Sequence, residues 1–351
     1  MYLMSKNIIL AQIDFDKFIF NVYRPDLLPF AIRGENVNLF SVYSWLTQRV
    51  LSLSRSNAKR ILDSLSLDQN NKMAICFACK GLSLTDCYWL KSENDTYSTW
   101  ESVNLYTNSL SDAVARVALT GEYISIQGHI NTPELTNAGA YAKCWRRWKD
   151  GIYLYKTGSM QGSNKEYLVD ILCSDLLDRT CVSHVIYTKG QSGLRPMSRC
   201  KNMTNQTFSI CDMNYYAGYC SRNNINLQSW LEKQKDYYDM LIVDYLINNT
   251  DRHTGNWGVY FNADTGVVLK LHPLFDHNLA LDLNGDTQSK VILGKSLEEC
   301  AKFAKHRSYL DISNLYKYAK TAAVKKRFYD IFQRSDEYVK FMERLKMYKS
   351  W

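Results

Sequence analysis

Three polar residues in the second half of the chain have the types and spacing of a phosphoryl-transfer site. Asp251 is followed five residues later by Asn256, and Asp276 follows twenty residues after that. A carboxylate such as Asp251 can orient a substrate hydroxyl and accept its proton. The oxygens of Asn256 and Asp276 suit Mg²⁺, which neutralises nucleotide phosphates. Singly, such residues more often form loops or cap helices, but together they favour a phosphate site.

Two predicted strands must return the second aspartate to the asparagine. Residues 257–269 read as two strands joined by a polar, glycine-containing turn. A hairpin of this length would bring Asp276 back beside Asn256. The spacing therefore predicts a hairpin whose two ends carry the metal-binding oxygens.

A buried helix is expected immediately before Asp251. Residues 230–245 have a helical period and become apolar on all sides, as in a helix inside a lobe. Asp244 lies within this apolar run and needs a partner, for which Arg252 is the candidate. Such a helix would hold the loop rigidly, as phosphoryl transfer requires.

Three histidines accompany the acidic residues. His253 is interpreted as a packed, hydrogen-bonded scaffold of the loop rather than as a titrating catalyst. His272 and His277 flank Asp276. Because Mg²⁺ prefers oxygen ligands, we interpret both as core or supporting groups.

The motif Asn249-x-Asp251-Arg252-His253-x-x-Asn256, with Pro273-Leu274-Phe275-Asp276, resembles the HipA-like serine/threonine kinases. It resembles the phosphoinositide kinases less closely. The resemblance covers about residues 150–285. It implies an α+β, bilobal, protein-kinase-like fold with a mostly helical C-terminal lobe, and ATP and Mg²⁺ as cofactors. It also implies a Ser/Thr acceptor on a protein, with Asp251, Asn256 and Asp276 as catalytic residues, the last two holding the metal.

A kinase also needs a lysine on the phosphates and backbone donors over the nucleotide. Residues 151–156 alternate like a strand and place Lys156 on the apolar face. Taken alone, this pattern favours a lysine that snorkels to the surface; within a kinase, Lys156 would contact the phosphates. Upstream, residues 136–143 are small and polar, so Thr136 and Gly139 are expected in a turn that covers phosphates. One glycine is a weak signal and matches no Walker-type loop.

Glu166 allows two interpretations. It can form a capping box with Ser163 at the start of a predicted helix that carries Leu168 and Leu172. It can instead pair with Lys156, as the first acid on the helix after the kinase lysine does in the family it resembles. The residues alone leave both open.

Composition limits the class of protein. The 351 residues are 46% hydrophobic and 22% charged, with a net charge of +8, which suits a globular protein that handles anions. The ten cysteines are spread along the chain, and neither a signal peptide nor a membrane span is recognisable. Cytoplasmic localisation is therefore expected.

Three domains are predicted: residues 1–108, an α/β region of uncertain role; 109–212, the nucleotide-binding lobe; and 213–351, the catalytic lobe. Residues 72–107 read as alternating strand-like segments, and residues 182–187 read as a further strand. Helices around 41–53 and 57–65 could form a DNA-binding pair that exposes Arg55, Lys59 and Arg60. An ordinary helix pair is the preferred interpretation, because no dense basic stripe is present.

Other functions remain open at this stage. The same catalytic residues would serve a small-molecule or lipid-headgroup kinase, and a nucleotide-binding pseudokinase could act as an interaction module. All three acidic or amide positions are filled, which counts against the pseudokinase. Family toxins often work beside a separate DNA-binding partner, so an antitoxin-like partner is possible, whereas direct nucleic-acid binding is not expected.

Overall fold

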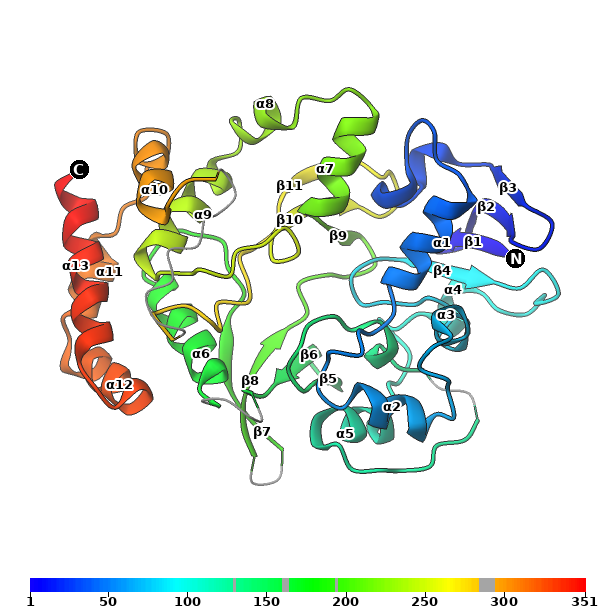
Figure 1. Ribbon diagram of the computed structural model, residues 1–351, viewed down its shortest axis with the longest axis horizontal. Helices are drawn as coiled ribbons and strands as arrows, with labels where there is room; N and C mark the ends of the chain where they lie inside the picture. Colours follow the sequence, from blue (N-terminus) through cyan, green and yellow to red (C-terminus); the bar gives the residue numbers. More distant parts are fainter. Residues whose placement is uncertain (129–130, 160–163, 193–194, 284–293) are drawn as a thin grey trace. The chain divides into compact units, whose positions relative to one another are not determined.

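The computed structural model describes residues 1–128, 131–159, 164–192, 195–283 and 294–351. These residues form two compact units whose segments alternate along the chain (Figure 1). Unit 1 comprises residues 1–156, 201–225 and 259–270; unit 2 comprises residues 157–200, 226–258 and 271–351. The three consecutive domains expected from the sequence remain a prediction.

Unit 1 begins with an antiparallel sheet in the order β3-β2-β1-β4 (Ile19–Val22, Ile8–Asp14, Tyr2–Ser5 and Tyr88–Lys91). Its inward side chains join a core that includes Met4, Trp89 and Trp100. Helices in this part of the unit are α1 (Leu39–Gln48), α2 (Ala58–Ser64), α3 (Lys72–Ala78), α4 (Trp100–Val103) and α5 (Asp112–Thr120). Asn38 and Ser111 cap α1 and α5 by accepting backbone N–H groups, as short polar side chains do.

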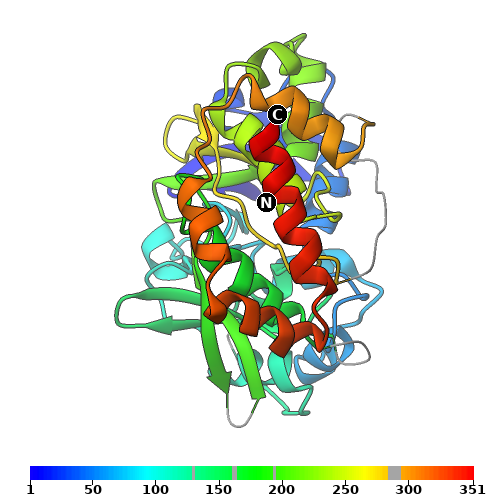
Figure 2. The same cartoon turned by 90° about the vertical axis from the view of Figure 1, so that its left-hand side faces the viewer.

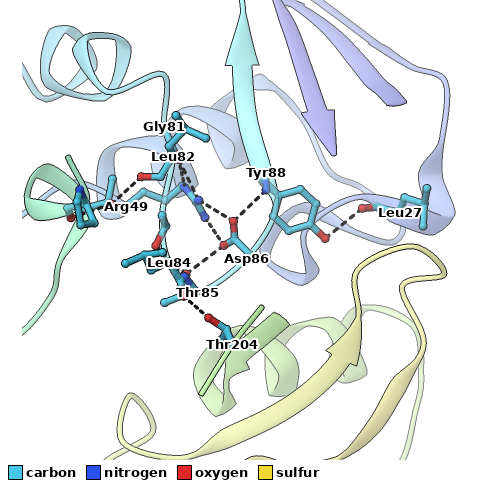
Figure 3. A network of polar contacts seen from close by, with 12 residues as sticks. Leu27, Arg49, Gly81, Leu82, Leu84, Thr85, Asp86, Tyr88 and Thr204 are labelled. Atoms are coloured by element: carbon cyan, nitrogen blue, oxygen red, sulfur yellow. Dashed lines mark hydrogen bonds and ion pairs between the residues drawn. The ribbon is translucent and has the colours of Figure 1, made fainter. Parts of the chain in front are cut away.

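A buried ion pair connects α1 with the chain that leads into β4. Arg49 Nη1 and Nη2 donate to the Asp86 carboxylate at 2.7 and 2.9 Å, and the same guanidinium contacts the Gly81 carbonyl (Figure 3). Asp86 also accepts the Tyr88 N–H at 3.0 Å, and the Tyr88 hydroxyl donates to Leu27. Since both charges are buried, their mutual hydrogen bonds offset the cost of removing them from water.

Further along the chain, unit 1 contains a β-hairpin, a second group of strands and helix α7. The β5–β6 hairpin (Lys143–Trp148 and Gly151–Lys156) is antiparallel. The second assembly has the order β11-β10-β9 (Val268–Leu271, Gly258–Asn262 and Phe208–Asp212), and α7 (Met213–Arg222) follows β9 directly. The predicted hairpin within residues 257–269 is thus confirmed.

Unit 2 is mainly helical. Its elements are α6 (Glu166–Leu177), the β7–β8 hairpin (Tyr187–Ser192 and Arg195–Lys201), α8 (Leu227–Leu231), α9 (Lys235–Leu246), α10 (Leu297–Lys305), α11 (Ser313–Ala319), α12 (Ala322–Phe332) and α13 (Asp336–Ser350). Every residue of α9 from Tyr237 to Leu246 is buried, as predicted. Helices α10 and α13 pack on α9, while α11 and α12 pack on α6 (Figure 2). Within the described residues, no helix is both long and apolar enough to cross a bilayer.

Two local predictions are wrong. Residues 72–78 form helix α3 rather than a strand, because Asn71 accepts the Ala74 N–H and starts a helix. A short apolar run does not distinguish the two forms by its period. The strand expected over residues 182–187 begins only at Tyr187, preceded by a single bridge between His184 and Leu274.

Candidate active site

The loop after α9 is organised by one buried ion pair. Arg252 Nη2 and Nε donate to the Asp244 carboxylate at 3.0 Å each, and both side chains are at most 2% exposed. The Asn249 amide donates to the same carboxylate at 2.9 Å. This confirms the predicted partner of Asp244. The helix thereby holds the loop through charge-assisted hydrogen bonds shielded from water.

Asn256 closes the loop back onto Asp251. Its amide Nδ2 donates to the Asp251 carbonyl at 3.1 Å, and its own backbone N–H donates to His253. Asn256 is buried, whereas Asp251 is partly exposed. Because the amide nitrogen is used inside the loop, the orientation of the side chain is fixed and its carbonyl oxygen is the atom left for a cation.

Arg252 also joins the two ends of the β10–β11 hairpin. Its Nη1 donates to the Asn256 carbonyl at 2.7 Å and to the Phe275 carbonyl at 3.1 Å. Phe275 immediately precedes Asp276, so one guanidinium contacts the backbone at or beside each predicted metal ligand. The hairpin and this shared donor bring the Asn256 and Asp276 segments together.

Asp276 has an unusual backbone conformation. Its φ is +59°, and its N–H donates to the Tyr187 hydroxyl at 3.3 Å. Left-handed backbone is uncommon outside glycine and is tolerated best by Asn and Asp. Such conformations often occur at functional sites, where the surrounding structure maintains them. Asp276 therefore has a backbone conformation that is typical of residues at functional sites.

The donor set suits a hard cation rather than a protein-enclosed metal cage. Among the described residues, no group of three or more His, Cys, Asp and Glu side chains could hold a metal ion. One amide oxygen and one carboxylate instead match the way Mg²⁺ is bound beside substrate phosphates, which supply further ligands. The residues present therefore fit a nucleotide-bound Mg²⁺.

The histidines differ in their surroundings. His272 is buried beside Phe275, and burial lowers its pKa to about 4, so its ring is neutral at pH 7. His277 is also buried, in agreement with the predicted core role of both residues. The prediction that His253 is packed is wrong, because its side chain is exposed; its Nδ1 does accept the Gly255 N–H at 3.1 Å.

The chain that follows Asp276 is held by a contact that the sequence did not suggest. Arg344 of α13 donates to Asp282 at 3.0 Å and to the Leu246 carbonyl at 3.1 Å. The Asn248 amide donates to the other oxygen of Asp282 at 2.7 Å. Arg344 lies more than sixty residues beyond Asp282 in the chain. Only the packing of α13 on α9 reveals this connection.

Lys156, the predicted phosphate lysine, lies in unit 1 at the end of β6. Its side chain is buried, and its ammonium lies 5.7 Å from the centre of the Tyr141 ring. The snorkelling interpretation is therefore wrong. Lys143 is paired directly with Lys156 across the hairpin and is also buried. Directly opposed residues of an antiparallel pair lie on the same face of the hairpin, so Lys143 adds a second ammonium group to the face that carries Lys156. We add Lys143 to the candidate residues.

The turn that precedes β5 contains Thr136 and Gly139. Thr136 ends a short 3-10 helix, and its hydroxyl donates to the Leu82 carbonyl at 2.7 Å. Gly139 has φ +92°, and a Cβ there would lie 2.2 Å from Lys143 Nζ. That ammonium donates to the Ala138 carbonyl at 2.7 Å. The backbone conformation therefore favours glycine here, whereas the nearby ammonium is the movable end of a flexible side chain.

Glu166 does not cap its helix in the predicted way. Helix α6 begins at Glu166 itself, so this residue is in the first rather than the third helical position. Ser163, the other half of the expected capping box, lies outside the described residues. Glu166 is buried, and its Oε2 accepts the Ser159 N–H at 3.1 Å. Glu166 belongs to unit 2 and Lys156 to unit 1, and their pairing stays a prediction.

Arg55 has no exposed guanidinium for DNA. It is buried and forms an ion pair with Glu134 at 2.6 Å. The expected exposure of Arg55 is therefore wrong, whereas Lys59 and Arg60 of α2 are exposed as expected. The sequence pattern missed this because a basic residue in a polar turn is usually solvated.

We expect Arg252→Met to destabilise the protein strongly. It leaves the Asp244 carboxylate buried without its cation, which typically costs about 3–5 kcal/mol. Denaturant unfolding would measure the loss. Lys326→Met is the matched control, because Lys326 pairs with Asp330 on the exposed surface of α12, where an ion pair contributes about 0–1 kcal/mol. Similar effects of both changes would contradict the assigned role of Arg252.

Comparison with known proteins identifies the fold. No protein-family model and no curated protein sequence matches the chain. Among solved structures, the chain is similar to one from the Shewanella oneidensis MR-1 toxin–antitoxin system HipA, HipB and its operator DNA. The identity is 12% and the TM-score is 0.59, over 100% of this chain and 97% of that chain. It is also similar to the Helicobacter pylori proinflammatory kinase CtkA, with 15% identity and a TM-score of 0.45, over 62% of this chain and 91% of that chain.

The likeness to the HipA structure extends over the whole chain. It includes the mixed α/β elements of residues 1–156 and the helices of residues 297–350. The mixed α/β elements and antiparallel sheets agree with the predicted fold class. The chain therefore has a HipA-like kinase fold.

Proposed function

We propose that this protein is an ATP- and Mg²⁺-dependent kinase that phosphorylates a Ser or Thr hydroxyl of a protein. The observation that carries the proposal is the set of hydrogen bonds from Arg252. Through these bonds Arg252 holds the Asp251–Asn256 loop on α9. The same guanidinium donates to the carbonyls of Asn256 and Phe275. A kinase depends on such positioning, because phosphoryl transfer requires little covalent chemistry from the protein.

Each candidate residue has a distinct role in this proposal. The partly exposed Asp251 would orient the acceptor hydroxyl and take its proton. Asn256 and Asp276 would hold Mg²⁺, which neutralises phosphate charge when bound. On the nucleotide side, the residues assigned to contacts or to orientation are Lys156, Lys143, Glu166, Gly139 and Thr136.

Incubation of the purified protein with ATP and Mg²⁺ tests the proposal. We expect intact-mass spectrometry to detect added phosphate on the protein itself or on a generic protein acceptor. ATP consumption with small hydroxyl compounds or lipid headgroups, but not with proteins, would favour the alternative acceptors. Nucleotide binding without any transfer or ATP consumption would favour a pseudokinase.

We expect Lys156→Met to weaken nucleotide affinity about ten- to one-hundred-fold, since a hydrogen bond to a charged group contributes about 1.5–3 kcal/mol. The thermal stability should change little, because methionine retains most of the buried apolar stem. Calorimetry with a non-hydrolysable ATP analogue would measure the affinity. Lys149→Met is the control, as Lys149 is exposed in the turn of the same hairpin. Unchanged affinity in Lys156→Met would remove this residue from the site.

We propose that the protein acts in the cytoplasm. All ten cysteines are free thiols, which suits a reducing, cytoplasmic compartment. The HipA structure comes from a complex with HipB and operator DNA. We propose an antitoxin-like or DNA-binding partner for this chain as well, which co-purification from the native host would test.

A further inference from the structure

The segment 134–143, here called the 134–143 loop, contains three of the candidate nucleotide residues. It starts with the short helix that ends at Thr136, passes through Gly139 and enters β5 at Lys143. A loop that covers phosphates must present its backbone in one conformation, because its N–H groups are useful only when preorganised. Another part of the protein must therefore hold the loop in that conformation.

One buried guanidinium reaches three places along this loop. Arg55 Nη2 donates to Glu134 Oε2 at 2.6 Å and to the Lys143 carbonyl at 2.7 Å. Its Nη1 donates to the Glu134 carbonyl at 2.7 Å and to the Asn137 carbonyl at 3.4 Å. Arg55 therefore connects the start, the middle and the end of the loop. A planar fork can serve several acceptors in this way, whereas an ammonium is a point charge.

The turn around Arg55 adds backbone contacts to the same loop. The Leu51 N–H donates to the Leu135 carbonyl at 2.8 Å, and the Ser56 N–H donates to the Ala140 carbonyl at 2.7 Å. Glu134, besides binding Arg55, accepts the Trp145 N–H of β5 at 2.7 Å. The residues between α1 and α2 thus hold the loop at both of its sides.

We propose that Arg55, with Glu134, is a positioning residue for the nucleotide: it fixes the 134–143 loop, and it gives the N-terminal region a role in the reaction. The inference rests on the proposed function, since it assumes that the loop faces a nucleotide. Because Arg55 is buried, it would act on the nucleotide only through this loop. Its effect passes through the carbonyls of Asn137 and Lys143.

Arg55→Lys tests the proposal, because lysine keeps the buried charge beside Glu134 but cannot serve all of these acceptors. Arg49→Lys is the matched control: Arg49 is also a buried arginine that forms a fork with a carboxylate, in the same unit, and it contacts Asp86 and Gly81 rather than the loop (Figure 3). We expect Arg55→Lys to weaken binding of a non-hydrolysable ATP analogue about ten-fold or more. Arg49→Lys should change it less than about two-fold at a comparable melting temperature.

A second variant guards against loss of the fold. The double change Arg55→Met/Glu134→Met removes both charges, which is often neutral for stability, and it also removes the hydrogen bonds to the loop. It should fold and show the same weakened nucleotide binding. Wild-type affinity in a folded Arg55→Lys protein or in the double variant, or an equal loss in Arg49→Lys, would overturn the proposal.

Hydrogen exchange separates this inference from the proposed function. Backbone amides of residues 135–142 should exchange faster in Arg55→Lys than in Arg49→Lys, with no ligand present. If the wild-type protein binds no nucleotide, the proposed function fails and, with it, the nucleotide role of Arg55. If the wild type binds nucleotide and exchange in the loop is unchanged, the proposed function stands and the role of Arg55 is refuted.

Discussion

Replacement of Asp251 by alanine should remove phosphoryl transfer while sparing nucleotide binding. A group that orients and deprotonates the acceptor hydroxyl acts mainly on the reaction step, so its loss lowers the turnover number rather than the affinity for ATP. We expect transfer to fall about a hundred- to ten-thousand-fold. Stability should change little, because Asp251 is only partly buried and the ion pair between Asp244 and Arg252 is retained.

Two measurements on the same preparation test this expectation. Intact-mass spectrometry reports transfer, and calorimetry with a non-hydrolysable ATP analogue reports binding. Asp264→Ala is the control, since Asp264 lies in the turn between β10 and β11 and pairs with Lys6 at 2.5 Å. Retained transfer in Asp251→Ala would mean that another group serves the acceptor hydroxyl.

Replacement of Asp276 by alanine should abolish the Mg²⁺ dependence of nucleotide binding. A metal ligand acts in the ground state, because it holds the cation that neutralises the phosphates before any reaction takes place. The variant should therefore bind the ATP analogue equally weakly with and without Mg²⁺. Transfer should be lost as well, because the variant binds the nucleotide only weakly.

Backbone conformation needs a separate control at this position. Asp276 has φ +59°, a value that alanine adopts at a cost, so Asp276→Asn is made alongside. Asparagine tolerates this conformation and keeps an oxygen but loses the charge. We expect Asp276→Asn to fold like the wild type and to retain weakened Mg²⁺ dependence. Equal loss of binding in Asp251→Ala and in the Asp276 variants would contradict the division of roles.

Much of the active-site half was predictable from the sequence. The apolar run before Asp251 predicted the buried helix α9, and a lone Asp244 within it required a cation nearby, which is Arg252. The alternation and the turn within residues 257–269 predicted the β10–β11 hairpin. These inferences succeeded because they depend on local periodicity and on the cost of burying one charge.

The tertiary structure decided the contacts between segments that are distant in sequence. Arg55 was expected to be exposed in a polar turn. It is buried instead, because it forms an ion pair with Glu134, seventy-nine residues away in the chain. The register of the hairpin places Lys143 opposite Lys156, which no local pattern of residues indicates. Arg344 supports Asp282 from the last helix. A period reports which face of an element is buried, but not which other segment buries it, because that choice depends on how all the elements pack together.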